Sequence, residues 1–449
     1  MKYISHYIFK LVNSPFGQTT NRMFSKNFKK WDTITGWFVF FIALITYGIT
    51  VEPTSSFWDA GEYISTAAKL QVGHPPGAPL LQMIGAFMAM FALEPTQVAK
   101  MVNLVSGVSS AFTILFMFWT ITNLTRKLIS KEEVITNSKA LAILGSGIVG
   151  SLAFTFSDSF WFNATETEVY AMASLIMSLL LWLGLKWVDD LENTRGNKWI
   201  ILISFVVGLT FGIQFMGFLA IPTIGLLYYF KTYKTTTVKN FLLANIIVVA
   251  ILMLVYKFSL TYVLKVFGWS EVFFINTIGL PFNSGTIIMG LIFVGVFYWA
   301  LRYTRNNNYT GANTIVLCLM FLFLGFSSWL MLPIRANADV VINENDPSDA
   351  RSLLAYYNRE QYPGVDSPVY GAYYSDTFAP AGDEKDEKPK YEKDLKAGKY
   401  IIVNNYKDAL QGPNPDHVGL LPRMWSEQNA ENYMKYFDPL TFRIKSDYL

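Results

Sequence analysis

Nine apolar stretches constrain this chain more than any other feature of its sequence. They cover residues 34–51, 100–124, 139–157, 169–187, 198–215, 217–231, 240–263, 284–301 and 312–333. A transmembrane helix needs about 20 apolar residues to cross a hydrocarbon core of about 30 Å. Lipid offers no hydrogen-bond partner to the backbone, so segments that cross it are expected as helices. The sixth stretch is short, and Pro222 is expected to tilt or break it. The sequence therefore predicts an all-α integral membrane protein.

The composition agrees with lipid as the solvent. Of the 449 residues, 52% are hydrophobic and 15% are charged, whereas soluble domains carry about 25% charged residues. The net charge of +3 gives no reason to expect nucleic acid as a partner. A single cysteine, Cys318, excludes a disulfide framework. The three histidines, His6, His74 and His417, are far apart in sequence, which argues against a histidine-rich metal site.

Residues 53–99, between the first two spans, decide the topology. This segment holds a polar helix-like piece over 55–70, a His-Pro-Pro-Gly turn at 74–77 and an apolar helix over 78–93. If 78–93 lies in the outer leaflet without crossing, the predicted inner segments carry 18 Lys and Arg residues, and the outer loops before residue 334 carry three. The positive-inside rule favours this arrangement.

From residue 334 onward the sequence turns polar and rich in tyrosine. Because aromatic residues recur throughout this part, we expect it to fold as a soluble region. The charged run at 383–399 is expected to be a solvated loop. The predicted organisation is therefore a cytoplasmic basic segment (1–33), a transmembrane domain (34–333) with juxtamembrane helices in 53–99, and an outer-face soluble C-terminal region (334–449).

The first outer loop brings acidic side chains together. Residues 56–63 read Ser-Phe-Trp-Asp-Ala-Gly-Glu-Tyr, and on a helix Asp59, Glu62 and Tyr63 fall at i, i+3 and i+4. Two carboxyl groups then share one helix face, and Phe57 and Trp58 would seat the helix in the membrane interface. The structural alternative is a helix start whose acidic residues complement the N-terminal dipole.

The second outer loop, residues 157–170, carries negative charge without a cation. It contains Asp158, Glu166 and Glu168, and ends at Tyr170. Neighbouring carboxylates repel one another unless they share a cation or a proton. A divalent metal, a basic acceptor or Arg335 would supply the positive charge. The alternative is a solvated loop that caps the following helix.

Three further side chains are candidates for binding. His74 precedes a proline-rich turn that would hold its imidazole in place. Arg335 lies at the outer end of the last span, at a depth suited to phosphate binding. Gln214 lies inside an apolar span, where its amide needs a partner. The sequence leaves a structural alternative open for each: an interfacial hydrogen bond for His74, a neighbouring helix for Gln214, and snorkelling to the headgroups for Arg335.

These residues alone predict an acidic outer-face pocket in a multi-span membrane protein. No P-loop, GxGxxG, GxSxG, HExxH or CxxC motif occurs at a usable place, so nucleotide-driven transport and soluble-cofactor redox chemistry lack support. A positioned carboxylate suits an enzyme that deprotonates a hydroxyl. It equally suits a cation-coupled transporter.

Several blocks of the sequence, in this order, resemble one family of membrane proteins. The blocks are Phe57–Tyr63, Gly73–Leu80, Phe160–Tyr170, Gly208–Gly212 with Ile221 and Pro222, Leu332–Ala336, Asn358–Tyr362 and Leu421–Trp425. The family is common in Bacteroidota and is related to the animal transmembrane O-mannosyltransferase that acts on plexin-type receptors. It is placed in the GT-C superfamily of membrane glycosyltransferases, and the resemblance runs from about residue 34 to near the end of the chain.

The resemblance implies a GT-C-like multi-span bundle of about nine spans plus outer-leaflet juxtamembrane helices. It also implies transfer of a hexose, with mannose the expected sugar, from a polyprenyl-phosphate-linked donor to Ser or Thr hydroxyls of exported proteins. The enzyme would lie in a bacterial inner membrane with its active site in the periplasm. The alternatives are a transporter or flippase of a lipid-linked sugar, against which the lack of an internal repeat counts, and a non-catalytic subunit of an envelope complex that includes further membrane subunits.

The resemblance also implies roles for the acidic residues. Asp59 would be the general base, and Glu62 would orient the acceptor or support Asp59. Related O-mannosyltransferases carry adjacent acidic residues in this loop, whereas here two residues separate the pair. The expected substrate-binding residues are His74 and Arg335 for the donor phosphate, with Glu166, Glu168, Tyr170 and Gln214 around the pocket. The resembling enzymes require no metal, so none is assigned, and a divalent ion remains an alternative.

Overall fold

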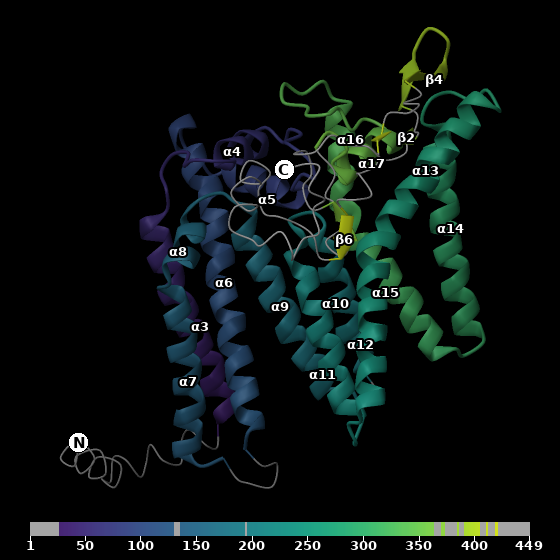
Figure 1. Ribbon diagram of the computed structural model, residues 1–449. Coiled ribbons are helices and arrows are strands. Elements are labelled where there is room, and N and C mark those ends of the chain that lie inside the picture. The colour runs from purple at the N-terminus through teal and green to yellow at the C-terminus, as the bar shows by residue number, and fades with distance from the viewer. Residues whose placement is uncertain are drawn as a thin grey trace, which may run out of the picture. The chain divides into compact units, whose positions relative to one another are not determined.

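The computed structural model describes two compact units of the chain (Figure 1). The described residues are 27–129, 135–193, 195–362, 370–372, 384–385, 390–404, 410–411 and 418–420. The first unit comprises residues 1–266 and 290–358, and the second comprises 267–289 and 359–449. Most of the predicted basic segment lies outside the described residues, as do His6, His417 and the block Leu421–Trp425.

Eight helical segments within the described residues are long and apolar enough to cross a membrane. They are Phe28–Thr50, Pro95–Lys127, Asn137–Thr155, Val169–Asp189, Phe215–Thr232, Val238–Asn276, Ser284–Asn306 and Thr310–Ala336. The predicted fold class, a mostly helical multi-pass membrane protein, is thereby confirmed. The expected span 198–215 is shorter, because α10 (Asn197–Thr210) has 14 residues, about 21 Å of helix. The chain then turns into η2 (Phe215–Leu219).

One apolar core of the first unit lies among α3 (Phe28–Thr50), α6 (Val98–Lys127) and α7 (Asn137–Thr155). Tyr47 and Phe118 are fully buried in it. The long helix α6 also packs against α9 (Val169–Asp189). Helix α6 therefore joins this core to the remaining helices of the unit.

A second core of the first unit lies among α9, α10, α11 (Ala220–Thr232) and α15 (Thr310–Phe326). Helices α10 and α15 touch through their backbones, because a Cβ on Gly208 would lie 2.1 Å from the carbonyl oxygen of Leu322. Small residues allow such close packing between membrane helices. The other long helical elements are α12 (Val238–Met253), the π-helical η3 (Leu254–Phe258), α13 (Ser259–Asn276) and α14 (Ser284–Asn306).

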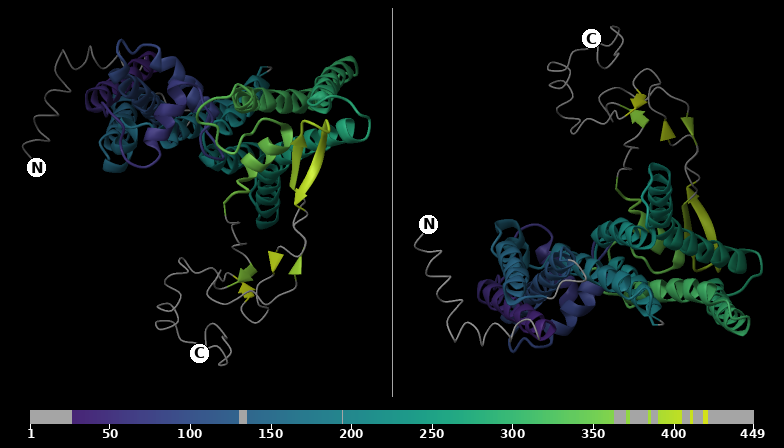
Figure 2. Two further views of the ribbon diagram at one scale, coloured as in Figure 1. Left: turned by 90° about the horizontal axis from the view of Figure 1, so that it is seen from above. Right: turned by 90° about the horizontal axis from the view of Figure 1, so that it is seen from below.

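Short helices collect at the end of the first unit where α6 begins (Figures 1 and 2). Helices α4 (Ala60–Ala68) and α5 (Pro79–Ala89) pack against each other and against α6. Helix α5 has 11 residues, about 16 Å, which is too short to cross the hydrocarbon core. This length agrees with the arrangement that the charge asymmetry favours. The other short helices of the unit are η1 (Pro95–Gln97), α8 (Asp158–Thr165), η4 (Ser327–Leu330), α16 (Met331–Ala336) and α17 (Ala350–Asn358).

Residues 334–358 pack within the first unit, and Leu353 and Tyr356 of α17 belong to its second core. The sequence groups these residues with the outer-face region that begins at 334. The packing of α17 brings a segment from late in the chain against the loop that follows α4. The subdivision into 1–33, 34–333 and 334–449 stays a prediction.

The second unit contains an antiparallel hairpin of β3 (Lys390–Asp394) and β4 (Lys399–Asn404). Strand residues 384–385, 390–394 and 399 lie within the charged run at 383–399, so the expectation of a loop there is wrong for these residues. A distant residue binds this hairpin: Asn276 donates to the carbonyl oxygen of Tyr400 at 2.8 Å and accepts its backbone N–H at 2.9 Å, and Tyr400 is 4% exposed. Two further strand pairs are β1 (Tyr370–Ala372) with β6 (Val418–Leu420), and β2 (Glu384–Lys385) with β5 (Leu410–Gln411).

Candidate functional site

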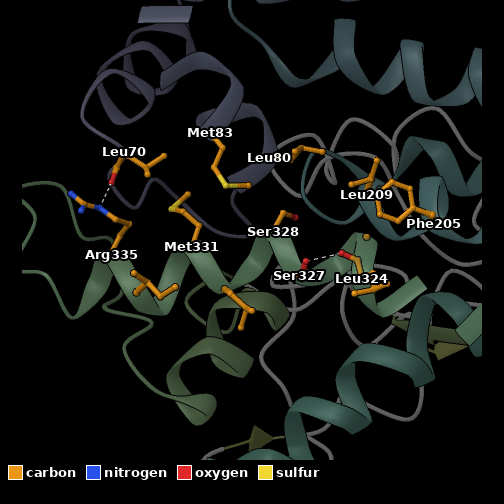
Figure 3. A pocket seen from close by; sticks show the side chains of 13 residues that line it. Leu70, Leu80, Met83, Phe205, Leu209, Leu324, Ser327, Ser328, Met331 and Arg335 are labelled. Carbon is orange, nitrogen blue, oxygen red and sulfur yellow. Dashed lines mark hydrogen bonds between the residues drawn. The ribbon is translucent and has the colours of Figure 1, made fainter. Parts of the chain in front are cut away.

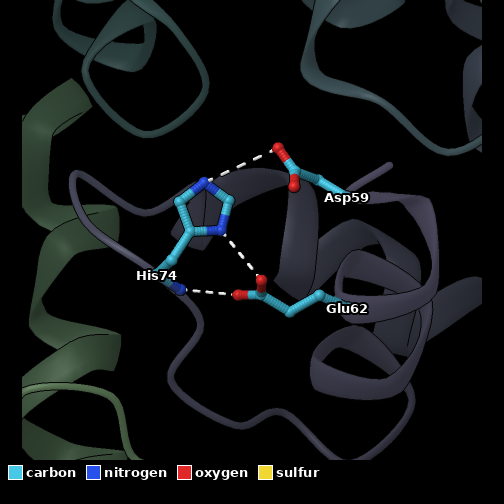
Figure 4. Close-up of side chains that lie close together, drawn as sticks. All are labelled: Asp59, Glu62 and His74. Carbon is cyan, nitrogen blue, oxygen red and sulfur yellow. Dashed lines mark hydrogen bonds and ion pairs between the residues drawn. The ribbon is translucent and has the colours of Figure 1, made fainter. Parts of the chain in front are cut away.

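Asp59, Glu62 and His74 form one cluster (Figure 4). The carboxylate of Glu62 accepts the backbone N–H of His74 at 2.6 Å, and its second oxygen lies 2.9 Å from the ring Nδ1. The other ring nitrogen, Nε2, lies 3.9 Å from the carboxylate of Asp59. The imidazole is thus held on one side by Glu62 and faces Asp59 on the other.

The start of α4 places the two carboxylates. Asp59 stands at the N-cap position, but its carboxylate caps no backbone N–H, and its side chain is 59% exposed. Glu62 follows in the first turn, on the same face, as the sequence predicts. Before Asp59, the exposed Trp58 adopts a left-handed backbone conformation with φ +63°. A residue other than glycine rarely adopts this conformation outside functional or tightly constrained sites.

The loop after α4 returns His74 to Glu62. Gly73 has no room for a side chain, since a Cβ there would lie 2.6 Å from the Glu62 carboxylate. Tyr356 of α17 donates its hydroxyl to the carbonyl oxygen of Gly73 at 2.5 Å and approaches that of His74 at 3.2 Å. The backbone N–H of Val72 donates to the carbonyl oxygen of Ile342, and the carbonyl oxygen of Val72 accepts the N–H of Glu344. The position of His74 therefore depends on residues about 270 further along the chain.

The charges of Glu62 and His74 stabilise each other. The hydrogen bond to Glu62 raises the pKa of His74 against the opposing effect of burial, and the charges of Glu62, Asp59 and Glu344 raise it further. Burial alone would raise the pKa of Glu62, but the hydrogen bonds and charge of His74 outweigh it and lower that pKa. The pair is therefore an imidazolium and a carboxylate over a wider pH range than the free groups.

The second acidic loop meets the first at this cluster. Glu166 ends α8 and Glu168 precedes α9, and both residues are largely buried. The pKa of Glu168 is raised to about 7. Burial is the largest cause, the negative charge of Asp59 is the next, and the charge of Glu166 adds to the rise. Burial and the charges of Glu168 and Asp59 also raise the pKa of Tyr63. Glu168 is therefore partly protonated near neutral pH, which relieves the repulsion between the two loops.

A buried amide on α6 ties the two loops together. Asn103, which is fully buried, donates to the carbonyl oxygens of Glu52 and Thr54 at 2.8 Å each. Its own side-chain oxygen accepts the hydroxyl of Thr167. Glu52 and Thr54 belong to the loop that leads to Asp59, and Thr167 lies between Glu166 and Glu168. Asn103 therefore binds both loops.

The remaining predicted residues lie in different surroundings. Tyr170 is about half exposed, and its charge contributes to the raised pKa of Tyr63, so it borders the cluster. Gln214 accepts the backbone N–H of Met216 at 2.7 Å and caps η2, which is a structural use of its amide. Glu344, Tyr356 and Asn103 were not singled out from the sequence, because each reaches the site through contacts between distant segments.

Arg335 lies at the opposite end of α4 from Asp59. Its Nε donates to the carbonyl oxygen of Leu70 at 2.6 Å, and Nη2 approaches that of Lys69 at 3.4 Å. Eleven positions separate Asp59 from Leu70, or roughly 16 Å along a helix. That Arg335 and His74 both contact the donor phosphate stays a prediction.

Asp59, Glu62 and His74 each offer one ligand atom, and these atoms lie within 4.8 Å of one another. Two oxygens and an imidazole nitrogen suit a divalent transition metal. A metal-bound histidine must be neutral, however, and the raised pKa of His74 opposes this. The cluster therefore fits an ion pair better than a metal site.

Part of the chain matches a known family. Residues 59–237 match the model described as "Protein O-mannosyl-transferase TMEM260 N-terminal domain", and residues 364–447 match a family of unknown function (DUF8416). The Dictyostelium discoideum protein named "Protein O-mannosyl-transferase tmem260" is 26% identical over 184 residues, which cover 38% of this chain and 20% of that protein. The Mus musculus protein of the same name is 27% identical over 172 residues, or 38% of this chain and 22% of that protein.

The chain is thus a distant homologue of the TMEM260 proteins and matches about a fifth of the length of these two relatives. No solved structure matches it. The family match contains Asp59, Glu62, His74, Glu166 and Glu168, whereas Arg335 lies outside it. The GT-C architecture, the bacterial inner membrane and the periplasmic active site stay predictions.

Proposed function

We propose that this chain transfers a sugar, with mannose expected, from a polyprenyl-phosphate donor to a Ser or Thr hydroxyl of an exported protein. One observation supports this more than any other: Asp59 presents an exposed carboxylate that caps no helix, opposite the imidazole ring that Glu62 holds in place. Homology to proteins named O-mannosyltransferases supports the choice of reaction. The positive-inside rule supports a periplasmic site.

In the proposed reaction, a carboxylate oxygen of Asp59 takes the proton of the acceptor hydroxyl. The hydroxyl oxygen then forms a bond to the anomeric carbon of the sugar, from the face opposite the phosphate. The bond between that carbon and the phosphate oxygen breaks, and its electron pair leaves with the lipid phosphate. A single displacement of this kind inverts the configuration of the anomeric carbon.

His74 would act on the leaving phosphate. Its Nε2–H is the ring donor that Glu62 does not occupy. Negative charge grows on the phosphate oxygen as the bond breaks, and a preorganised cation stabilises such charge. Glu62 would then act through His74, by orienting its ring and keeping it protonated. Glu168, whose pKa is about 7, would donate a hydrogen bond to a sugar hydroxyl while it is protonated.

The test is transfer of radiolabelled mannose from synthetic polyprenyl-phosphate mannose to a Ser/Thr peptide by the purified chain in nanodiscs. Asp59→Asn removes the base at constant size, so transfer should fall by about 10²–10⁴-fold. The matched control is Asp158→Asn, in the first turn of α8, which should transfer label like the wild type.

Equal transfer by folded Asp59→Asn and wild type would refute the assignment of the base. Donor binding without transfer by any variant would favour the transporter or the non-catalytic subunit, because transport leaves no covalent product. Transfer of a different sugar would keep the mechanism and change the donor.

A further inference from the structure

An apolar groove opens beside the C-terminal end of α4, away from the Asp59 cluster (Figure 3). Its volume is about 540 Å³. Its walls come from α5, α10, α15 and η4, through Leu80, Met83, Phe205, Leu209, Leu324 and Leu330. Apolar side chains thus dominate a hollow that is large enough to take part of a lipid chain.

Arg335 ends this groove. Figure 3 shows the guanidinium at one end of the labelled residues, with Phe205 and Leu209 at the other. Two of its five N–H groups point to the carbonyl oxygens of Leu70 and Lys69. Among the residues that the structure describes, no carboxylate pairs with it. The carbonyls at a helix C-terminus carry only about half a negative charge, so a cation beside apolar walls is left without a full counter-charge.

The depth of Arg335 matches that of lipid headgroups. It is the penultimate residue of the apolar segment Thr310–Ala336, and basic residues at such positions lie at the membrane interface. Leu324 and Leu330 precede it in the same segment and line the groove toward the middle of the span. The order of groups, a cation at the interface and apolar walls below it, matches an anionic headgroup with its chain.

We propose that this groove binds one anionic phospholipid, with the phosphate on Arg335 and an acyl chain along Leu324 and Leu209. The occupant is distinct from the sugar donor of the proposed function. In that donor a single oxygen joins the phosphate to the anomeric carbon, so its phosphate must lie beside the carbon that the acceptor hydroxyl on Asp59 attacks. Leu70, whose carbonyl oxygen binds Arg335, lies eleven positions from Asp59, or roughly 16 Å along a helix. The bound phosphate would bridge α16 to the end of α4.

The test measures lipid binding and needs no catalysis, so its failure is separate from failure of the proposed function. The purified full chain is delipidated and placed in nanodiscs of phosphatidylcholine with increasing phosphatidylglycerol, and bound lipid is counted by native mass spectrometry. The wild type should retain one phosphatidylglycerol. Arg335→Ala should weaken this binding about 10- to 100-fold, because it removes charged hydrogen bonds to the phosphate.

Two variants control for folding and location. Leu324→Trp fills the groove from a half-exposed position and should also abolish retention while Arg335 is intact. Arg305→Ala removes a cation at the end of α14, outside the groove, and should retain the lipid. Equal retention of phosphatidylcholine, or retention of phosphatidylglycerol by Arg335→Ala, would refute the proposal. One-for-one displacement by polyprenyl phosphate would refute it too, since the groove would then belong to the donor.

Discussion

The carboxylate of Glu62 binds two groups of His74 at once, the ring Nδ1 at 2.9 Å and the backbone N–H at 2.6 Å. One acidic side chain thereby sets both the orientation of the ring and the position of its loop. The contact leaves Nε2 facing Asp59. The two carboxylates of α4 therefore differ in use: Glu62 holds the imidazole, and Asp59 is free to meet an acceptor.

Replacing Glu62 by Gln should lower the pKa of His74, because the largest cause of its elevation, the hydrogen bond to a charged carboxylate, is weakened. A raised histidine pKa means that the cation persists below that pKa and is lost as pH rises through it. If transfer needs the cation, the rate of transfer by Glu62→Gln should begin to fall at a lower pH than the rate of the wild type as pH rises. The measurement is the alkaline limb of the pH–rate profile, together with NMR titration of the imidazole.

Glu344→Gln is the control for this prediction, because the charge of Glu344 raises the pKa of His74 less than the charges of Glu62 and Asp59 do. Its alkaline limb should move less than that of Glu62→Gln. An alkaline limb at the same pH in Glu62→Gln and the wild type would show that His74 is not the titrating group.

Glu168→Gln should change how stability depends on pH. The pKa of Glu168 is about 7, above its ordinary value of 4.5, so the folded chain holds a proton that the unfolded chain releases. Stability from this group is complete below pH 4.5 and is lost as pH rises toward about 7. Glutamine cannot ionise. The variant should therefore be more stable than the wild type at pH 8 and differ less at pH 5, as measured by thermal unfolding.

Asp158→Asn serves as the comparison, since it removes a carboxylate of the same loop from the first turn of α8. The difference in unfolding temperature between Asp158→Asn and the wild type should not grow between pH 5 and pH 8. Parallel stability curves for Glu168→Gln and the wild type would contradict the raised pKa.

The sequence predicts much of this site where local spacing decides the geometry. Asp59 and Glu62 lie on one face because helical period alone puts them there. The partner of Glu62 was not predictable, because it depends on the return of the chain at Gly73 and on Tyr356, 283 residues further along. Arg335 was expected near headgroup depth, and its binding to the end of α4 likewise joins segments that are far apart in sequence.

Tyr356→Phe should loosen the His74 loop without touching a charged group. The hydroxyl binds the carbonyl oxygens of Gly73 and His74, and the ring is buried to 1% exposure. Loss of a buried hydrogen bond costs about 1–3 kcal/mol of the free energy of unfolding when the acceptor is left unpaired. Transfer should also slow, because the imidazole is less well placed. Thermal unfolding and transfer assays check both effects.

The adjacent Tyr357→Phe is the matched control for that loss. Its hydroxyl makes a long contact of 3.4 Å with the carbonyl oxygen of Tyr256, away from His74. It should affect transfer less than Tyr356→Phe. Equal effects of the two variants would mean that α17 acts through packing and not through its bond to the loop.

Asn103→Ala should separate the two acidic loops. The amide is fully buried, and its loss leaves two carbonyl oxygens, those of Glu52 and Thr54, and the hydroxyl of Thr167 without their partner. Each buried polar group left unpaired costs about 1–3 kcal/mol, so the variant should unfold at a clearly lower temperature.

Asn123→Ala is the control on the same helix, because its amide makes one exposed bond, to Asp189. If Asn103 holds the loops in register, the pKa of Glu168 should also fall toward its ordinary value as Asp59 moves away. An Asn103→Ala chain that is as stable as Asn123→Ala, and that keeps the pH dependence assigned to Glu168, would show that helix packing alone brings the loops together.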